Sequence, residues 1–363
     1  MSVLTKLRQR ATTPFAPTPR GWIGIDIGSR AIKLAQLERV GEQIFFRNRW
    51  TVTRPEDPRT EAESRTDSLA GQLVELAHYR KLFSRPESAA ALSMSFHTLR
   101  SLELPAASHE ELRDMVNQEL AAEAAQADAD HVFDFWTTDT ATNEAVEVSA
   151  LSLPTSVATG VAQDLLTSGY ECQVLDGLPC ALARAVTLTA NAADGPVAAV
   201  DLGDRAFTFV LVADGKPRYT RVLRGGGLGT LMQPLRKALA LSHEQAMQLL
   251  VRYALDRGSD RGRPLVSGPA QLLRQPLMLL AQELKRTLDF VAAPRRGERP
   301  SELVLFGGGA SIRHLPSWLS QQLGLPARRW CLASSIPQAA TDDARYGVAA
   351  ALSMLRWEQH GCL

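Results

Sequence analysis

The sequence predicts an α/β protein built from two similar halves, and three observations lead to this prediction. A motif is repeated, because residues 23–37 read IGIDIGSRAIKLAQL and residues 198–212 read AAVDLGDRAFTFVLV. Strand-like and helix-like segments alternate along the chain, which is typical of α/β proteins. The chain has 363 residues, of which 45% are hydrophobic, and this is more than one core usually serves, so two or more folded units are expected.

Each copy of the repeat predicts two strands joined by a tight turn. The first strand ends on Asp26 or Asp201, and a glycine follows two residues later, Gly28 or Gly203. Glycine lets a ligand come close to the backbone, and successive N–H groups in such a turn can bind an anion. The carboxylates are suited to hydrated Mg²⁺. We therefore predict a phosphate-binding turn in each half.

The first half is predicted from short apolar runs, which indicate strands, and from leucines near helical spacing. Ser108 followed by Glu111 matches a capping box and marks a helix start. The expected strands are 22–27, 31–38, 43–52, 89–96, 99–104, 131–137 and 145–153, and the expected helices are 67–83, 108–127, 155–168 and 178–190.

The second half repeats the β-hairpin start, whereas a plain doubly wound sheet has a helix directly after its first glycine loop. Asp214-Gly215 is a hairpin turn signal. Ser242 is predicted to cap a helix, and residues 256–270 are predicted to form a loop. The expected strands are 197–202, 206–212, 217–223 and the buried ELVLF segment, and the expected helices include 228–240, 271–291 and 341–358.

Composition and missing motifs exclude several classes of protein. The net charge of +1 gives no long-range attraction to nucleic acid, and no apolar run reaches the eighteen residues of a membrane span. Residues 1–20 are predicted to be a flexible basic tail without the apolar centre of a secretory signal. The four cysteines form no C-x-x-C pair, which fits a reducing cytoplasm. Walker-type, dinucleotide-binding and G-x-S-x-G motifs do not occur in the sequence.

Five segments stand in the order of the signatures of the actin fold: DIGSRAIKL, LDGLPCALARA, DLGDRAFTFVL, LFGGGASIRHLPSWL and DARYGVAAALSML. Through residues 22–356 the chain resembles the actin-like ATPases, and among these it is most similar to the PilM family of type IV pilus assembly proteins. The closer match rests on IDIGSRAIKLAQLE, SLELPAASHEELRDMVNQEL and YECQVLDGLPCALARAV.

The resemblance implies an actin-like (ribonuclease H-like) two-lobed α/β fold with a small α+β insert of the FtsA type. The implied parts are the tail 1–20, a first lobe of 21–96 and 172–195, an insert of 97–171, a second lobe of 196–345, and a C-terminal helix 346–363 that returns to the first lobe.

The resemblance also implies a site for ATP and Mg²⁺ between the lobes. The cofactor-binding residues by motif position are Asp26, Gly28, Ser29, Lys33, Gly203, Asp204, Gly226, Gly307, Gly308 and Gly309. Asp26 and Asp201 are expected to hold the metal through water. Asp201 and Asp176 are the expected catalytic residues, with Asp176 orienting the attacking water.

Three of these assignments have alternatives that the sequence leaves open. Strand alternation can aim Lys33 at solvent. Asp176 equally fits a carboxylate that is favoured at a helix N-terminus. The three glycines Gly225–Gly227 equally suit a connection between the lobes.

The chain departs from its relatives at three cleft positions. Arg30 stands where relatives have a small residue, and it can crowd or clamp a phosphate. Met247 and Leu250 stand near places where relatives keep charged groups that reach the ribose and the adenine. We therefore expect at most slow ATP hydrolysis.

The expected function is that of a cytoplasmic adaptor, peripheral to the inner membrane, in the assembly of a type IV pilus or a related secretion system. Its expected partners are the N-terminal cytoplasmic tail of a PilN-like bitopic membrane protein and other pilus assembly proteins. The tail is expected to bind as an extended peptide near Leu99–Leu104. The alternatives are a sugar-kinase-like phosphotransferase and an FtsA-like membrane-associated filament protein.

Overall fold

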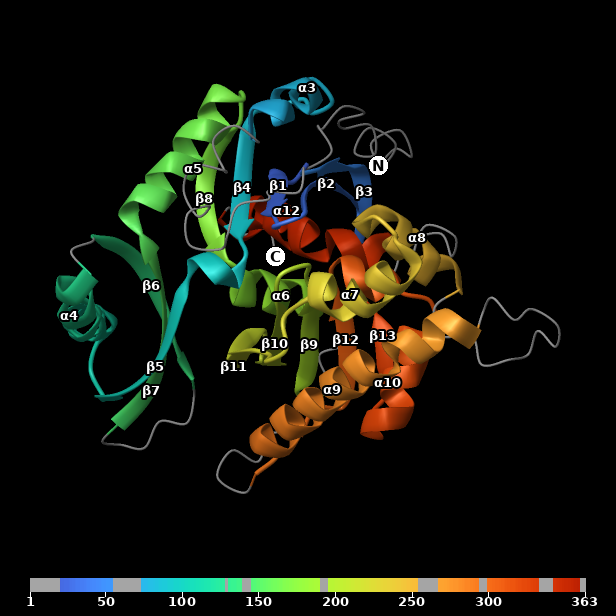
Figure 1. Ribbon diagram of the computed structural model, residues 1–363. Helices are drawn as coiled ribbons and strands as arrows, with labels where there is room; N and C mark the ends of the chain where they lie inside the picture. The colour runs from blue at the N-terminus through green and yellow to red at the C-terminus, as the bar shows by residue number, and fades with distance from the viewer. Residues whose placement is uncertain are drawn as a thin grey trace, which may run out of the picture.

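The computed structural model describes residues 20–54, 73–127, 130–138, 145–189, 195–253, 267–293, 299–332 and 342–359. In this part of the chain two five-stranded sheets lie one above the other with helices between them, and a smaller three-stranded sheet lies to one side (Figure 1). The prediction of an α/β fold with two similar halves is confirmed.

The repeat in the sequence is also a repeat in topology. The first sheet has the order β3-β2-β1-β4-β8, and the second has the order β11-β10-β9-β12-β13. In each sheet the first three strands along the chain pair antiparallel, each with the next. The fourth strand pairs parallel with the first, and the fifth pairs parallel with the fourth. The strands of the first sheet are β1 (Ile23–Ile27), β2 (Ala31–Val40), β3 (Gln43–Thr53), β4 (Glu87–Leu92) and β8 (Glu171–Gly177). Those of the second are β9 (Val197–Leu202), β10 (Phe207–Ala213), β11 (Lys216–Val222), β12 (Glu302–Phe306) and β13 (Ala327–Arg329).

Two helices fill the space between these sheets, α6 (Leu178–Thr187) and α12 (Gly347–Gln359). Helix α12 packs on β1, β2 and β4, while α6 packs on β9, β10 and β11, and the two helices contact each other. The approach of α12 to the first sheet is very close, because a β-carbon on Gly24 would lie only 1.8 Å from the Ala349 carbonyl oxygen. The Ser353 hydroxyl on α12 also donates a hydrogen bond to the Trp22 carbonyl at 2.6 Å.

Among the described residues, four further helices share a hydrophobic core with the second sheet. They are α7 (Leu228–Leu239), α8 (His243–Tyr253), α9 (Ser267–Val291) and α10 (Leu315–Leu323), with short 3₁₀ turns η4 (Gly308–Ser311) and η5 (Ala344–Tyr346). The predicted cap of α8 is confirmed, because the Gln245 amide donates to Ser242 Oγ at 3.1 Å. The predicted hairpin turn is also confirmed, since Asp214 and Gly215 have φ of 51° and 72°.

The third sheet has the order β5-β7-β6 and is antiparallel. Its strands are β5 (Thr98–Pro105), β6 (His131–Thr138) and β7 (Ala145–Pro154), and α4 (His109–Ala127) covers one face. The predicted capping box of α4 is present, with the Ser108 amide donating to Glu111 Oε2 at 2.8 Å. Helix α5 (Thr155–Thr167) packs on β8 as well as on β6 and β7, so it joins this sheet to the first one.

Three predicted elements differ from the structure. Of the helix expected at 67–83, residues 67–72 lie outside the described part, and the rest forms only η2 (Val74–Leu76) and the single turn α3 (Ala77–Arg80). The strand expected at 89–96 ends at Leu92, and η3 (Met94–Phe96) follows. Of the loop expected at 256–270, residues 256–266 lie outside the described part, and the rest forms the start of α9, where Pro269 stands in the first turn and is tolerated there.

Strands β8 and β13 were not predicted. The side chains of β8 are all only partly buried or exposed, and β13 has three partly buried residues, so neither gives the continuous apolar run or strict alternation that identifies a strand. Both are outer strands, and their pairing with β4 and β12 stabilises them.

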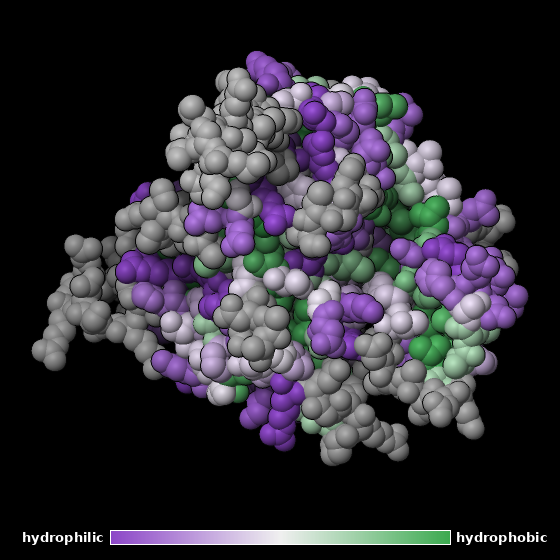
Figure 2. All heavy atoms as spheres, turned by 180° about the vertical axis from the view of Figure 1, so that it is seen from behind, coloured by the Kyte–Doolittle hydropathy of each residue, from purple (hydrophilic) through white to green (hydrophobic). Residues whose placement is uncertain are grey.

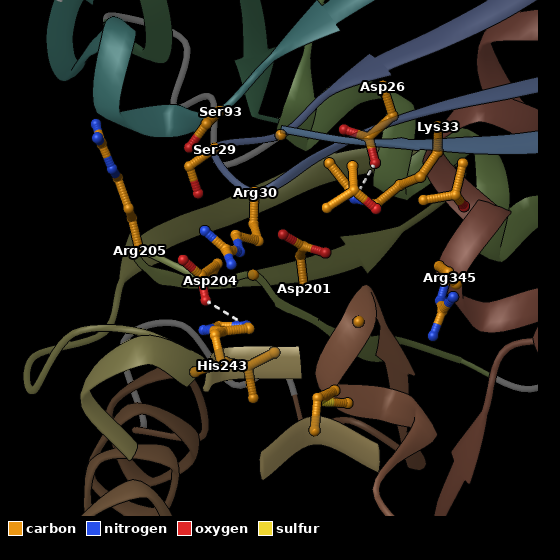
Figure 3. Close-up of a pocket in the computed structure, with 18 of the residues that line it drawn as sticks. Asp26, Ser29, Arg30, Lys33, Ser93, Asp201, Asp204, Arg205, His243 and Arg345 are labelled. Atoms are coloured by element: carbon orange, nitrogen blue, oxygen red, sulfur yellow. Dashed lines mark hydrogen bonds and ion pairs between the residues drawn. The ribbon is translucent and has the colours of Figure 1, made fainter. Parts of the chain in front are cut away.

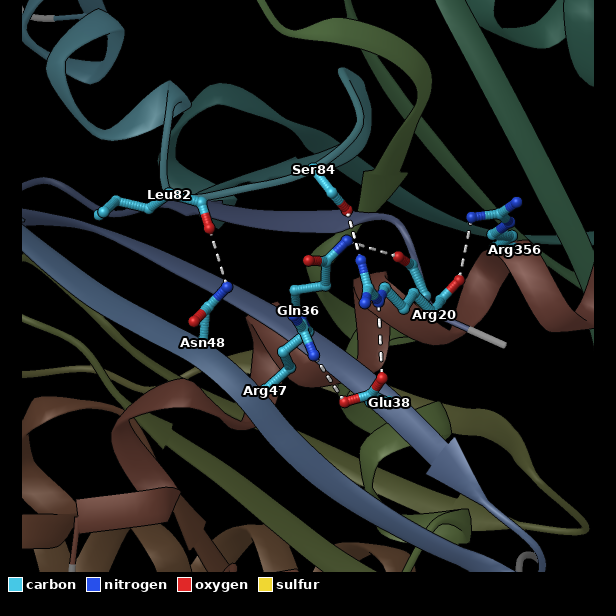
Figure 4. A network of polar contacts seen from close by, with 9 residues as sticks. Arg20, Gln36, Glu38, Arg47, Asn48, Leu82, Ser84 and Arg356 are labelled. Carbon is cyan, nitrogen blue, oxygen red and sulfur yellow. Dashed lines mark hydrogen bonds and ion pairs between the residues drawn. The ribbon is translucent and has the colours of Figure 1, made fainter. Parts of the chain in front are cut away.

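The start of the described chain is firmly attached to the first sheet. Of the predicted tail, residues 1–19 lie outside the described part, but Arg20 belongs to the folded part (Figure 4). Its guanidinium lies 3.5 Å from Glu38 Oε1 and donates to Ser84 Oγ at 2.9 Å, and its carbonyl accepts a hydrogen bond from Arg356. The inclusion of Arg20 in the predicted flexible tail is therefore wrong.

The described surface carries interspersed hydrophilic and hydrophobic side chains when seen from behind (Figure 2). Among the described residues, no helix has both the length and the apolar character that crossing a membrane requires.

Candidate nucleotide site

A cavity of about 450 Å³ lies where the β1–β2 hairpin of the first sheet faces the β9–β10 hairpin of the second (Figure 3). Both predicted turns line it. From the first come Asp26, Gly28, Ser29, Arg30 and Lys33, and from the second come Asp201, Gly203, Asp204 and Arg205. The volume is within the range of small-molecule sites.

The two hairpins have the same register, which is why they present the same positions to the cavity. Asp26 stands opposite Lys33 across β1 and β2, and Asp201 stands opposite Thr208 across β9 and β10. The neighbouring parallel strands β4 and β12 pair with β1 and β9 in the same way.

Lys33 points into the cavity and not to solvent. Its ammonium donates to Asp26 Oδ2 at 2.8 Å, and both side chains are only about one-seventh exposed, 14% and 13%. Burial by itself would lower the pKa of Lys33, but the charges of Asp26 and Asp201 outweigh it, so the pKa is raised. Lys33 is therefore a fixed cation between the two aspartates.

Among the described residues, no ion pair or hydrogen bond is recorded for the Asp201 carboxylate. Its removal from water raises its pKa from 3.8 to about 7, because the attraction of Lys33 only partly compensates and the charge of Asp26 adds to the rise. A cation close to a buried carboxylate of this kind would favour its ionised form.

A buried arginine holds the first turn, and no local sequence pattern predicts it. Arg54, 6% exposed, donates from Nη1 to the Gly28 carbonyl at 2.7 Å, and its amide donates to the Arg30 carbonyl at 2.9 Å. It lies just past the end of β3, where a polar residue reads as the start of a loop. Arg54 positions the turn without lining the cavity.

Helix α7 holds the second turn through its backbone. The amides of Leu228 and Gly229 donate to the carbonyls of Gly203 and Asp204, each at 3.0 Å. A β-carbon on Gly227 would lie 2.3 Å from the Asp204 carbonyl oxygen, so only glycine fits. Gly226 does not line the cavity; it has φ of 81°, and a β-carbon there would meet Thr230 Oγ1 at 2.5 Å.

The three glycines after β12 have three different surroundings. Gly308 lines the cavity. Gly307, with φ of 79°, lies beside Asp201, whose Oδ1 would be 2.4 Å from an added β-carbon. Gly309 packs against Leu202 and Leu228 and is buried.

Helix α8 forms another wall with His243, Met247 and Val251. His243 Nε2 lies 3.3 Å from Asp204 Oδ1, a contact that the sequence analysis did not identify. Of the two departures noted on this helix, only Met247 lines the cavity. Leu250 is fully buried in the core of the second lobe.

Asp176 lies in different surroundings from the two other predicted carboxylates, Asp26 and Asp201. It is the penultimate residue of β8 and is not part of the cavity lining. Its Oδ2 accepts a hydrogen bond from Arg184 Nη1 at 2.8 Å, and its Oδ1 accepts one from the Gly177 amide. A role in orienting water stays a prediction, and the immediate contacts of Asp176 are structural.

The donors around the cavity fit a nucleotide with a hydrated magnesium ion. Carboxylates, serine hydroxyls, cationic side chains and turn backbone surround the cavity, and the carboxylates of Asp26 and Asp201 stand at the ends of the two repeated strands. Magnesium keeps several waters and usually takes one or two protein carboxylates together with phosphate oxygens. Within the described ranges no group of three His, Cys, Asp or Glu side chains could hold a metal ion by itself.

Comparison with solved structures supports the class of fold. The chain is similar to a chain of the "PilM-PilN type IV pilus biogenesis complex", with a TM-score of 0.73, 21% identity, and coverage of 92% of this chain and 98% of that one. It is also similar to the ethanolamine utilization protein EutJ from Carboxydothermus hydrogenoformans, with a TM-score of 0.51, 14% identity, and coverage of 95% and 94%. The fold is therefore the actin-like two-lobed α/β fold that the sequence predicts.

The sequence identifies the family within this class. The model of the family "Type IV pilus assembly protein PilM" matches residues 24–330, which include both hairpins and the three-stranded sheet. The chain belongs to the PilM family of type IV pilus assembly proteins.

Proposed function

We propose that this protein is an ATP-binding adaptor of type IV pilus or related secretion-system assembly, and that it acts at the cytoplasmic face of the inner membrane. Its partner is the N-terminal cytoplasmic tail of a PilN-like membrane protein, and ATP with Mg²⁺ occupies the cleft between the lobes. The observation that carries the proposal is the cavity of about 450 Å³ lined by both copies of the repeated hairpin, in a chain of the PilM family.

The hairpins supply the phosphate end of this site. The Ser29 hydroxyl and the turn amides donate to phosphate oxygens, and Lys33 contributes a cation already held in place by Asp26. Bound Mg²⁺ supplies positive charge to the phosphates, and Asp26 and Asp201 hold it through water. On the other side, Gly308 and Met247 lie where the nucleoside approaches the second lobe.

The three-stranded sheet supplies the partner site. Strand β5, which contains Leu99–Leu104, is an outer strand that pairs only with β7 among the described strands. An extended peptide can add to such an edge. Leu102 and Leu104 pack under α4, whereas Leu99 packs towards the α6 side, so β5 joins two hydrophobic clusters.

A hydrogen bond links the three-stranded sheet to the second five-stranded sheet. Trp136 Nε1 on β6 donates to the Pro217 carbonyl on β11 at 2.6 Å, and β11 belongs to the same sheet as the second hairpin. A change in the angle between the lobes must therefore either move the three-stranded sheet or break this hydrogen bond. Nucleotide can act on the partner only through unequal affinity for the two arrangements.

Two titrations test the proposal. Calorimetry with MgATP is expected to show one site per chain, and fluorescence anisotropy with a labelled PilN-like tail peptide is expected to show saturable binding whose affinity changes when MgATP is present. A scrambled peptide of the same composition is the control. Failure of the tail peptide to bind better than the scrambled one contradicts the adaptor role, and sugar-stimulated ATP turnover would favour a phosphotransferase instead.

A further inference from the structure

The cationic side chains around the cavity are not equally available to a ligand. Five lysine and arginine side chains line it: Arg30, Lys33, Arg205, Arg252 and Arg345. Lys33 is paired with Asp26, and Arg345 Nε lies 3.5 Å from Asp342 Oδ1. Within the described ranges, the structure records no ion pair or side-chain hydrogen bond for the guanidinium of Arg205 or of Arg252.

Arg205 stands on a rigid base at the tip of the second hairpin. The closing pair of this turn is Leu202 with Phe207, and the carbonyls of the two residues before Arg205 accept hydrogen bonds from the start of α7. The backbone of Arg205 is therefore fixed, while its side chain is exposed. Such a side chain can move to a ligand without breaking an ion pair or hydrogen bond recorded among the described residues.

The direction of the side chain places its charge at one end of the cavity. Figure 3 shows Arg205 rising from the second hairpin towards the side of the first lobe where Ser29 and Ser93 lie, and Arg345 stands at the far side of the same view. Arg30 occupies the same position in the first turn, after Gly28-Ser29, as Arg205 does after Gly203-Asp204. The terminal phosphate of a nucleotide held by both turns would have one arginine from each lobe beside it.

We propose that Arg205 is a specificity-determining residue that binds the terminal phosphate of a nucleoside triphosphate, so that the cleft prefers ATP to ADP and closes more tightly on ATP. This inference rests on the proposed function. The guanidinium is charged at all working pH values and its paired donors match two phosphate oxygens, whereas a diphosphate leaves it without that partner. The contact crosses from the second lobe to a phosphate that the first hairpin also holds, so it joins the two lobes only when the third phosphate is present.

The test compares Arg205→Ala with Arg252→Ala by titrating each variant and the unmodified chain with MgATP and with MgADP. Arg205→Ala is expected to weaken ATP binding by about tenfold or more while ADP binding changes by less than about threefold, since losing a charged hydrogen bond costs at least one factor of ten. Arg252→Ala removes an equally unpaired arginine from α8 and is expected to leave the ratio of the two Kd values unchanged. Arg205→Lys is expected to recover part of the preference, because it keeps the charge without the paired geometry.

The outcomes separate this inference from the proposed function. Equal weakening of ATP and ADP in Arg205→Ala, or no change in either, overturns the role of Arg205 while nucleotide binding stands. An unmodified chain that binds neither nucleotide overturns both. Because Arg205 is exposed, thermal denaturation of the variant is expected to match that of the unmodified chain.

Discussion

The two hairpins share a motif, a register and a cavity, yet different parts of the chain support them. Side chains hold the first turn: Lys33 pairs with Asp26, and Arg54 donates to the Gly28 carbonyl. Backbone amides of α7 hold the second, where Gly227 allows the close approach. A repeated motif thus fixes the shape of a turn, while its rigidity comes from residues that the motif does not contain.

The charges of the two turns differ as a result. The carboxylate of Asp26 already has a cation at 2.8 Å, whereas burial raises the pKa of Asp201 to about 7. The Asp26 carboxylate therefore has its counter-charge within its own hairpin, whereas burial disfavours the ionised form of Asp201.

The largest expected effect tests the backbone support of the second turn. Gly227→Ala places a β-carbon 2.3 Å from the Asp204 carbonyl oxygen and 2.5 Å from its carbon, so backbone must shift. We expect a loss of roughly 3 kcal/mol in the free energy of unfolding, measured by urea denaturation, together with loss of nucleotide binding. Gly160→Ala on α5 is the control, because no atom lies within 4 Å of the added carbon; equal stability of the two variants would remove the role given to α7.

A smaller effect tests the side-chain support of the first turn. Arg54→Met fills the same space but leaves the Gly28 carbonyl without its donor at 2.7 Å. We expect a loss of about 2 kcal/mol in the free energy of unfolding and weaker nucleotide binding. Arg54→Lys should recover part of both, and a variant with unchanged nucleotide affinity would show that the turn keeps its shape without this arginine.

Matched substitutions of the two aspartates should change stability in opposite directions. Asp26→Asn leaves the Lys33 ammonium without its partner and is expected to cost about 1 kcal/mol in nucleotide-free denaturation at pH 8. Asp201→Asn removes a carboxylate whose ionised form is unfavourable in the folded chain, and it is expected to stabilise by roughly 1–2 kcal/mol at that pH.

The pH dependence gives the sign of the second effect. Folding raises the pKa of Asp201 from 3.8 to about 7, so the folded chain binds this proton more tightly than the unfolded chain does. The stability that this proton contributes is fully present below the unfolded pKa of 3.8 and is lost as the pH rises to about 7. The advantage of Asp201→Asn should therefore be present above pH 7 and disappear near pH 4. An advantage that does not vary with pH would contradict the stated cause.

The smallest expected effect concerns the contact between the three-stranded sheet and the second sheet. Trp136→Phe keeps an aromatic ring but removes the hydrogen bond to the Pro217 carbonyl at 2.6 Å. We expect a loss of about 1 kcal/mol in stability and a reduced effect of MgATP on tail-peptide affinity, measured by anisotropy. Full retention of that nucleotide effect would show that another contact carries the coupling.

The sequence predicted the parts of the fold that local patterns specify. The hairpins, the caps at Ser108 and Ser242 and the turn at Asp214 were predicted because each depends on a few adjacent residues. Strands β8 and β13 were missed, since partly exposed outer strands are stabilised by their neighbours and carry no periodic pattern.

The residues of the candidate site likewise divide into those that a local sequence pattern predicts and those that it does not. The cavity residues of both turns were predicted from the repeat, because the residues of one motif are adjacent in sequence and fold into one hairpin. Arg54 and His243 were not, since their contacts with Gly28 and Asp204 cross 26 and 39 residues of sequence and no local pattern records them. Leu250 was expected near the nucleotide but faces the core, because helical position decides which side chain reaches the cavity.

The position of α12 has a consequence for biosynthesis. Strands β1, β2 and β4 bury their inner face against this helix, which follows them by more than 250 residues and packs so closely that Gly24 touches Ala349. During translation α6, which packs on the second sheet, is made before the strands of that sheet, whereas the first sheet stays without α12 until all strands of the second sheet have been made. The nascent first lobe must wait with an uncovered apolar surface, and this is the stage at which a ribosome-associated chaperone would have most to protect.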